Sequence, residues 1–365
     1  MKINAKLYRV LLKVMTALVV LIIIGTVGFV ITTVIGRNNL YGKNKGQGPD
    51  LTGFAQAEVL TEETVLEDEI DEVAWQEGDI RYEGEIYRYN EDILTFLFLG
   101  IDKNEEARVV DDGIKGGQSD ALFLLVLNPH TEEMTIIGIP RDTITDVDIY
   151  GKHGDYIGTT PTQISLQHGY GDGDKLSCER SVKAVSGLFY ELPIHGYCSI
   201  NMGGIPLLND AIGGVEVTAL QDVPRAKIKE GETVLLMGQD AYHYLHDRDT
   251  KIFASAEARL ARQKQYITAY IGKAKAAVKE DITLAVKLYS TVSKYMVTDI
   301  TVDEVSYLAT QASNYSFDDD HISVLKGDVK IGADGFEEFH VDEAYLYELI
   351  LDTFYEKISP QEQTP

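Results

Sequence analysis

Four charged residues stand at the ends of apolar segments, where a folded sheet would bring them together: Asp102, Asp120, Arg141 and Asp142. Asp102 follows the first apolar segment, Asp120 immediately precedes the second, and Arg141 and Asp142 follow the third. If the three segments form an antiparallel meander, these points share one edge of the sheet and the four side chains converge. The carboxyl ends of strands are also where α/β sheets bind ligands.

This set of residues suits a hard cation bound to a phosphate. Mg²⁺ takes one or two carboxylates and leaves its other positions to water and phosphate oxygens, and arginine adds bidentate hydrogen bonds to those oxygens. The set therefore predicts a Mg²⁺ site that binds a phosphate, with Arg141 donating to the phosphate oxygens and Asp142 as the favoured carboxylate to accept the proton of an attacking hydroxyl. The alternative is that all four are solvated turn residues. Because strand-end acids carry little packing, Asp120→Asn is expected to leave folding nearly intact.

A second polar cluster falls in a segment that is predicted to be helical. Arg259, Arg262 and Gln263 are spaced i, i+3 and i+4, so they share one helical face. If Ser255 caps this helix, both arginines oppose the helix dipole, and a bound anion would offset that cost. Arg248 lies shortly before them. The alternative is an ordinary basic helix face.

The elements that must position these residues indicate a single layered α/β domain. Three continuously apolar runs are typical of strands buried on both faces: Ile93–Leu99, Ala121–Leu127 and Met134–Ile139. Two shorter strands are predicted at Tyr197–Ile200 and Val215–Leu220. Helices are predicted at Thr162–Tyr170, Ser177–Tyr190, Asn201–Ile212, Ser255–Lys279, Ile282–Met296, Asp303–Ser313 and Asp342–Lys357. Strands interspersed with helices predict one mixed α-β-α domain over residues 93–358, with a tail at 359–365.

An uncharged apolar run, Val14–Ile35, precedes the domain and is long enough to cross a bilayer. The basic residues before it are Lys2, Lys6, Arg9 and Lys13. They predict a cytoplasmic tail at 1–13, a transmembrane anchor at 14–35 and an extracellular domain at the cell membrane. A cleaved signal peptide fits less well, because its apolar core would be shorter and would end in a small-residue cleavage site.

The charge of the chain is unevenly distributed. Residues 1–49 hold seven basic and no acidic side chains, so all 58 acidic side chains fall after them. A domain this acidic is a poor candidate for binding nucleic acid. Residues 36–92 are predicted to be a spacer and an acidic, solvated stalk, with a helix around Glu58–Trp75. Cys178 and Cys198 could form a disulfide outside the cell or remain buried thiols.

Six segments together resemble the LytR-CpsA-Psr family of cell-envelope glycopolymer transferases. They are FLFLGIDK (96–103), QSDALFLLVLNPHT (118–131), IGIPRDT (137–143), LNDAIGGVEV (208–217), GQDAYHYLHDRD (238–249) and ARLARQKQ (258–265). The resemblance implies a membrane-tethered mixed α/β domain. It also implies transfer of a glycopolymer, such as teichoic acid or capsule, from a polyprenyl-pyrophosphate carrier to peptidoglycan. The transfer forms a phosphodiester and is supported by Mg²⁺.

The resemblance also implies roles for individual residues. Asp102 and Asp120 match the metal-binding acids, and Arg141 with Asp142 matches the catalytic Pro-Arg-Asp motif. The residues that match pyrophosphate-binding positions are Arg141, Arg248, Arg259, Arg262 and Gln263. Gln118 and His246 are also predicted to bind the pyrophosphate, but they depart from the family pattern because arginines are usual at these two positions.

Two other functions remain open at this point. Water could replace the sugar hydroxyl, which would make the protein a polyprenyl-pyrophosphate hydrolase. The two replaced arginines could instead indicate a non-catalytic envelope-binding or regulatory protein. A carrier lipid would need an apolar channel. Two apolar helix stripes could line it, although plain core packing is the favoured interpretation of each. The stripes are Val182, Val185 and Phe189, and Leu207, Leu208 and Ile212.

Overall fold

A mixed sheet forms the centre of the molecule. The computed structural model describes residues 28–43, 48–52, 57–60, 75–110, 115–247 and 255–358. Within them, six strands pair in the order β12-β9-β4-β5-β6-β13. Their bounds are β4 (Leu94–Ile101), β5 (Ser119–Asn128), β6 (Glu133–Ile139), β9 (Gly196–Asn201), β12 (Met296–Thr298) and β13 (Ile322–Val324).

The predicted antiparallel meander is confirmed. Phe98 of β4 pairs with Phe123 of β5, and Phe123 pairs with Gly138 of β6. Strands β9 and β13 flank the meander in parallel with β4 and β6. Along β4, Leu97 packs into the core on one face and Phe96 into the core on the other. The strands are therefore apolar throughout because both faces of the sheet are covered.

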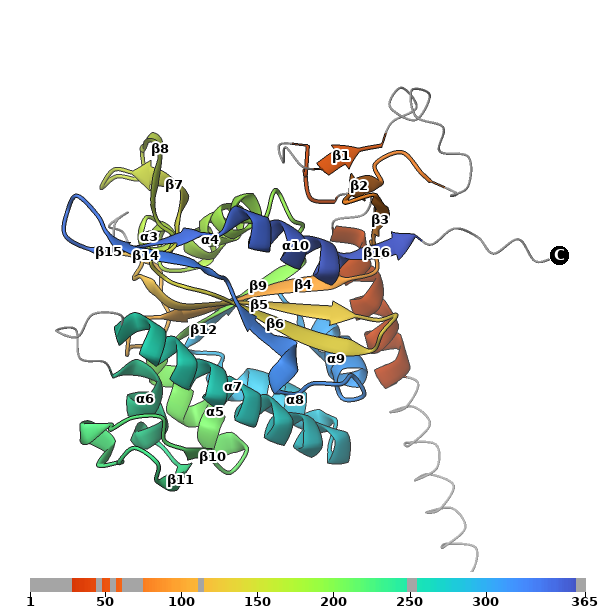
Figure 1. Cartoon of the computed structure of the whole chain (residues 1–365). Helices are drawn as coiled ribbons and strands as arrows, with labels where there is room; N and C mark the ends of the chain where they lie inside the picture. The colour runs from red at the N-terminus through yellow and green to blue at the C-terminus, as the bar shows by residue number, and fades with distance from the viewer. Residues whose placement is uncertain are drawn as a thin grey trace, which may run out of the picture.

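Helices cover the two faces and complete the predicted α-β-α layering (Figure 1). One face carries α4 (Lys175–Leu188) and α10 (Glu343–Phe354). The other face carries α5 (Ile205–Ala211), α6 (Gln239–His246), α7 (Ser255–Glu280), α8 (Thr283–Val292) and α9 (Val302–Ala312). Val185 and Phe189 are fully buried in the core beneath α4. They are therefore core residues, and the interpretation of this stripe as core packing is confirmed.

Three β-hairpins were not predicted. They are β7 (Ile144–Tyr150) with β8 (Tyr156–Gln163), β10 (Val215–Thr218) with β11 (Thr233–Leu236), and β14 (Gly327–Ile331) with β15 (Glu337–Val341). The predicted helix Thr162–Tyr170 is only the short α3 (Leu166–Gly169), because β8 runs through Gln163. A bridge between Thr143 and Phe339 joins two of the hairpins, which project from one end of the molecule (Figure 1).

Part of the predicted acidic stalk is packed domain instead. Strands β1 (Ala57–Val59), β2 (Ile80–Tyr82) and β3 (Glu85–Tyr89) form a four-stranded sheet with β16 (Tyr355–Ile358). Side chains that point to the core are apolar and alternate with charged ones that do not: Ile80 and Tyr82 of β2 are buried on either side of Arg81, and Ile86 of β3 is buried next to the exposed Glu85. Ile80 and Tyr82 are buried in the main core together with Leu51. The packed domain therefore begins before residue 93, and residues 61–74 of the predicted helix lie outside the described residues.

Residues 28–43 form a helix that docks against α9 (Figure 1). Leu40 is buried with Tyr307 of α9, and Lys43 lies 3.2 Å from the Glu304 carboxylate. A Cβ atom at Gly36 would overlap the backbone of Asp303, so this contact requires glycine. Of the predicted anchor Val14–Ile35, only residues 28–35 are described. Among the described helices, none is both long and apolar enough to span a bilayer.

The two cysteines are free thiols on opposite faces of the sheet. Cys178 of α4 is buried in the core of one face, and Cys198 of β9 lines a cavity on the other. Burial raises the pKa of both thiols to about 12, so they stay protonated near neutral pH. Of the two alternatives, the structure shows buried thiols.

Candidate active site

The four charged residues at the strand ends come together at one edge of the sheet. The backbone N–H of Asp102, just after β4, donates to the carbonyl of Gln118, 3.0 Å away. Asp120 is the second residue of β5, and Arg141 follows the end of β6. An Arg141 guanidinium nitrogen, Nη1, donates to Asp120 Oδ1. The expected convergence is therefore present.

Asp120 is the centre of this cluster because it binds two arginines. Its Oδ1 accepts from Arg141, and its Oδ2 accepts from Arg259 Nη1 of α7 at 2.9 Å. Arg141 also donates to Gln118 Oε1 at 2.6 Å, so Gln118 belongs to the site. Two guanidinium groups share the Asp120 carboxylate, so charge-assisted hydrogen bonds already satisfy part of each arginine, and Asp102 and Asp142 add negative charge nearby.

The three residues of α7 that were predicted to bind pyrophosphate have different partners, one at Asp120 and two at the C-terminal end of α6. Arg259, Arg262 and Gln263 are all buried, and only Arg259 is bonded to Asp120. Gln263 Nε2 donates to the carbonyl of Leu245 at 3.3 Å, and Arg262 donates to the carbonyl of Asp247. Arg262 and Gln263 therefore hold the C-terminal end of α6 in place. Arg248 lies outside the described residues.

His246 ends α6 and faces the carboxylates. Its Nε2 lies 3.3 Å from Asp102 Oδ1, and its ring stacks on Tyr242 with centroids 5.0 Å apart. The hydrogen bond between the two side chains raises the pKa of His246 and lowers the pKa of Asp102. One ligand atom each from Asp102, Asp120 and His246 can be chosen within 4.8 Å of one another. These three residues could hold one cation.

Two histidines lie three positions apart, but they do different things. His243 Nδ1 lies 3.3 Å from the Asp247 carboxylate and His246 Nε2 faces Asp102. The three-residue spacing alone does not identify the site, because Asp102 and Asp120, the acids that His246 approaches, lie at the ends of β4 and β5.

Asp142, the predicted base, lies beside the cluster. Its Oδ1 is 3.3 Å from Arg141 Nε, and its carbonyl accepts from the backbone N–H of Phe339 at 2.8 Å. It lines a cavity of about 410 Å³ together with Asp120, Arg141 and Arg259. A hydroxyl that enters this cavity can therefore reach both a carboxylate and the arginines.

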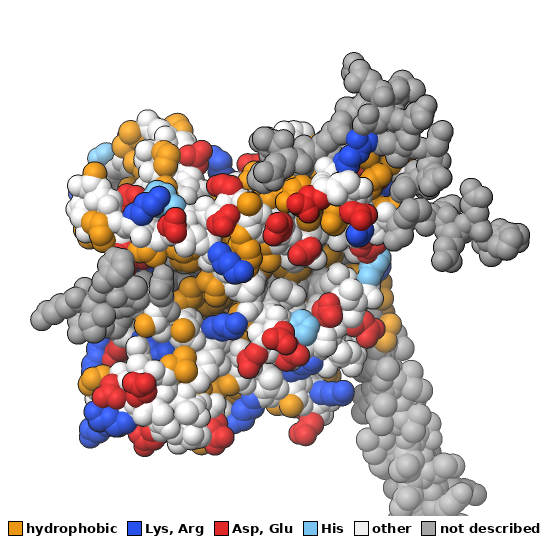
Figure 2. Space-filling view, viewed as in Figure 1, with side chains coloured by type: hydrophobic (Ala, Val, Ile, Leu, Met, Phe, Trp, Pro, Cys, Tyr) orange, Lys and Arg blue, Asp and Glu red, His pale blue; other side chains and the backbone are white. Residues whose placement is uncertain are grey.

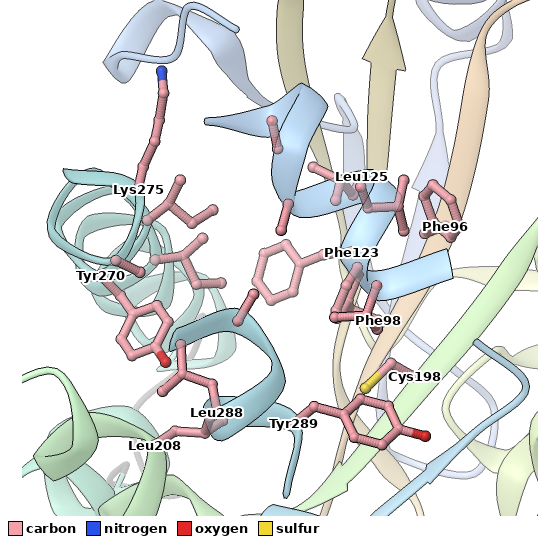
Figure 3. Close-up of a pocket in the computed structure, with 18 of the residues that line it drawn as sticks. Phe96, Phe98, Phe123, Leu125, Cys198, Leu208, Tyr270, Lys275, Leu288 and Tyr289 are labelled. Atoms are coloured by element: carbon pink, nitrogen blue, oxygen red, sulfur yellow. The ribbon is translucent and has the colours of Figure 1, made fainter. Parts of the chain in front are cut away.

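An apolar cavity of about 520 Å³ lies between the sheet and the helices. Figure 3 shows Phe98, Phe123 and Leu125 facing Tyr270 and Leu288 across it. It lies in the same layer as the charged cavity, because Ala121 borders the charged cavity and Phe123, two residues along β5, borders the apolar one.

Of the two helix stripes that were candidates for a lipid channel, only one contributes a residue to the apolar cavity. Leu208 lines the apolar cavity, whereas Leu207 is exposed and Ile212 packs in a separate core beneath α5. The other stripe lies on the opposite face of the sheet. Most of the cavity lining comes instead from the strands and from α7, which periodicity alone could not assign to a channel.

The molecular surface carries mixed charges. On the face drawn in Figure 2, Asp and Glu side chains are spread among Lys and Arg side chains. The arginines of the site are largely buried against Asp120 instead of forming part of such a surface.

Comparison with known proteins identifies the family. The model of the LytR_cpsA_psr family matches residues 57–351. The chain belongs to the LytR-CpsA-Psr family. The match begins before residue 93, in agreement with the packed strands β1 to β3.

Curated relatives of this LytR-CpsA-Psr protein carry the name polyisoprenyl-teichoic acid–peptidoglycan teichoic acid transferase TagU. The Bacillus cereus protein is 26 % identical over 283 residues, which cover 77 % of this chain and 84 % of that one. The Halalkalibacterium halodurans protein is 29 % identical over 215 residues, which cover 58 % of this chain and 63 % of that one.

Solved structures share the fold of this family member. Bacillus subtilis TagV superposes with a TM-score of 0.54 at 23 % identity, covering 70 % of this chain and 94 % of that one. TagT bound to LI-WTA superposes with a TM-score of 0.53 at 21 % identity, covering 71 % of this chain and 88 % of that one. Both confirm the mixed α/β architecture.

The burial of Asp120 argues against the expectation that Asp120→Asn leaves folding intact. The side chain of Asp120 is 5 % exposed and neutralises two arginines. Because breaking a buried ion pair costs about 3–5 kcal/mol, we expect the free energy of unfolding to fall by about 3 kcal/mol. Chemical denaturation measures this change, and added pyrophosphate should recover part of it by binding the arginines.

Asp102→Asn is the matched control for this prediction. The Asp102 side chain is 56 % exposed, so its removal should change the free energy of unfolding by less than about 1 kcal/mol. Equal losses in the two variants would show that burial of the Asp120 pair does not govern folding at this edge.

Proposed function

We propose that this LytR-CpsA-Psr protein transfers a glycopolymer from a polyprenyl-pyrophosphate carrier to peptidoglycan, with formation of a phosphodiester. The observation that carries the proposal is the position of a buried arginine and carboxylate cluster beside an apolar cavity in one layer. A lipid pyrophosphate needs both environments, one for the phosphates and one for the chain. The names of the relatives favour a teichoic acid as the first donor to test.

The residues present fit a divalent cation of the Mg²⁺ type. Asp102 and Asp120 offer hard oxygen donors close to the arginines that would bind phosphate. When bound, such a cation would neutralise charge on the pyrophosphate oxygens. Mg²⁺ is the expectation that the family resemblance implies, and cation dependence can be measured directly by chelation and replacement.

The side chains of the site can perform the transfer mainly by positioning and by neutralising charge. Arg141 and Arg259 would donate to the pyrophosphate oxygens in place of their contacts with Asp120. Asp142 would accept the proton of the attacking peptidoglycan hydroxyl. The hydroxyl oxygen bonds to the phosphorus next to the glycan, the bond from this phosphorus to the bridging oxygen breaks, and polyprenyl phosphate leaves.

A transfer assay tests the proposed reaction. The full chain is incubated with a polyprenyl-pyrophosphate teichoic acid precursor, with and without a peptidoglycan acceptor. We expect glycan in the peptidoglycan fraction, and little release of glycan without acceptor because the base needs a bound hydroxyl. Release in solution at the same rate with and without acceptor would instead indicate a hydrolase, and no turnover in either case would indicate a binding protein.

The apolar cavity generates a separate prediction about the lipid. Ala274 of α7 lines the cavity, so Ala274→Trp should obstruct it. We expect binding of a polyprenyl pyrophosphate to weaken about tenfold or more, a loss of about 1.4 kcal/mol. Binding of inorganic pyrophosphate should be unchanged, and calorimetric titration measures both.

The control for the cavity variant is Ala276→Trp. Ala276 is exposed on the outer side of the same helix, so it tests for effects of tryptophan on α7 itself. Similar loss of lipid binding in both variants, or loss in neither, would mean that the lipid lies elsewhere.

We further propose that residues 14–35 anchor the protein in the cell membrane with the domain outside. The support is the uncharged run itself and the side chains in its described part that face solvent: Phe29, Val30, Ile31, Val34 and Ile35. Such exposure of large apolar groups suits a lipid environment. Protease added to intact spheroplasts should remove the domain and spare about 35 N-terminal residues. Protection of the domain in intact cells would contradict this topology.

A further inference from the structure

The environment of His246 resembles that of a metal-binding histidine more than that of a phosphate-binding residue. Its Nε2 points at the two carboxylates, and its Nδ1 lies 3.4 Å from Asp247 Oδ1. Asp247 is itself held by two hydrogen bonds from Arg225, at 2.6 and 2.8 Å. A carboxylate that accepts the Nδ1 proton leaves the Nε2 lone pair directed into the site, which is the usual support for a histidine that binds a metal.

Packing fixes the orientation of the imidazole as well. The ring stacks on Tyr242 with an interplanar angle of 15°, and Tyr242 is buried in α6. Arg262 donates to the carbonyl of Asp247, so the residue after His246 is tied to α7. The imidazole is thus held from both sides before any ligand binds.

We propose that His246 is a third protein ligand of the cation site, and that the site prefers Mn²⁺ to Mg²⁺. Two carboxylates and one imidazole form a mixed oxygen and nitrogen donor set. Mg²⁺ favours oxygen donors, whereas imidazole nitrogen favours transition metals, and Mn²⁺ also accepts carboxylate and phosphate oxygens. The inference deepens the cation site of the proposed function and rests on Asp102 and Asp120 forming that site.

The donor set also gives His246 a role that arginine could not have. An arginine at this position would add a positive charge toward the phosphates, but it has no lone pair to offer a metal. The replacement at position 246 therefore exchanges a direct phosphate contact for a stronger hold on the cation that contacts the phosphates.

The test measures metal binding by the full-length protein without turnover, so its failure is separable from failure of the transferase proposal. Mn²⁺ is added to the purified protein, and pulsed electron paramagnetic resonance detects coupling to a directly bound ¹⁴N nucleus. Competition with Mg²⁺ gives the preference for Mn²⁺, defined as the dissociation constant of Mg²⁺ divided by that of Mn²⁺. We expect ¹⁴N coupling in the parent protein and none in His246→Gln. The preference for Mn²⁺ should fall about tenfold or more in that variant.

His243→Gln is the matched control, because His243 lies on the same helix and contacts Asp247 but does not belong to the cluster of Asp102, Asp120 and His246. It should keep the ¹⁴N coupling and the metal preference of the parent protein. The parent spectrum decides the matter even if His246→Gln folds poorly. Mn²⁺ bound without ¹⁴N coupling, failure of Mn²⁺ to bind, or coupling that persists in His246→Gln would overturn the inference.

Discussion

The shared ion pair of Asp120 with Arg141 and Arg259 is the interaction on which the site depends. It joins three elements that are distant in sequence, since the carboxylate belongs to β5, one arginine follows β6 and the other comes from α7. It therefore holds the helical layer against the edge of the meander. An arriving phosphate would compete with Asp120 for both guanidinium groups and so free carboxylate oxygens to face a cation.

The sequence was sufficient to predict the meander, the layering and the convergence at the sheet edge. Long apolar strands and short turns leave few alternatives for β4 to β6, and the meander then places Asp102, Asp120 and Arg141 together. The 3.6-residue periodicity correctly put Arg259 and Arg262 on one buried face of α7. These features depend on local pattern and on the geometry of regular elements.

The rest depended on tertiary contacts that no local pattern encodes. Sequence spacing could not show that Arg262 reaches α6 while Arg259 reaches Asp120, nor that His246 faces Asp102. The acidic composition of residues 36–92 concealed strands, because alternation is a weaker signal there than the excess of charge. The burial of Asp120 was missed for the same reason, since the arginines that cover it lie far along the chain.

Helix 28–43 is packed firmly against α9 and is therefore fixed relative to the domain. Helix α9 turns Glu304 and Tyr307 toward this helix, and turns Leu308 and Ala309 toward the apolar cavity. Under the proposed topology, a tilt of the anchor in the bilayer would be transmitted through the close contact at Gly36 to a wall of the cavity. The thickness and tension of the surrounding membrane would then change the width of the cavity, and with it the affinity of the protein for the carrier lipid.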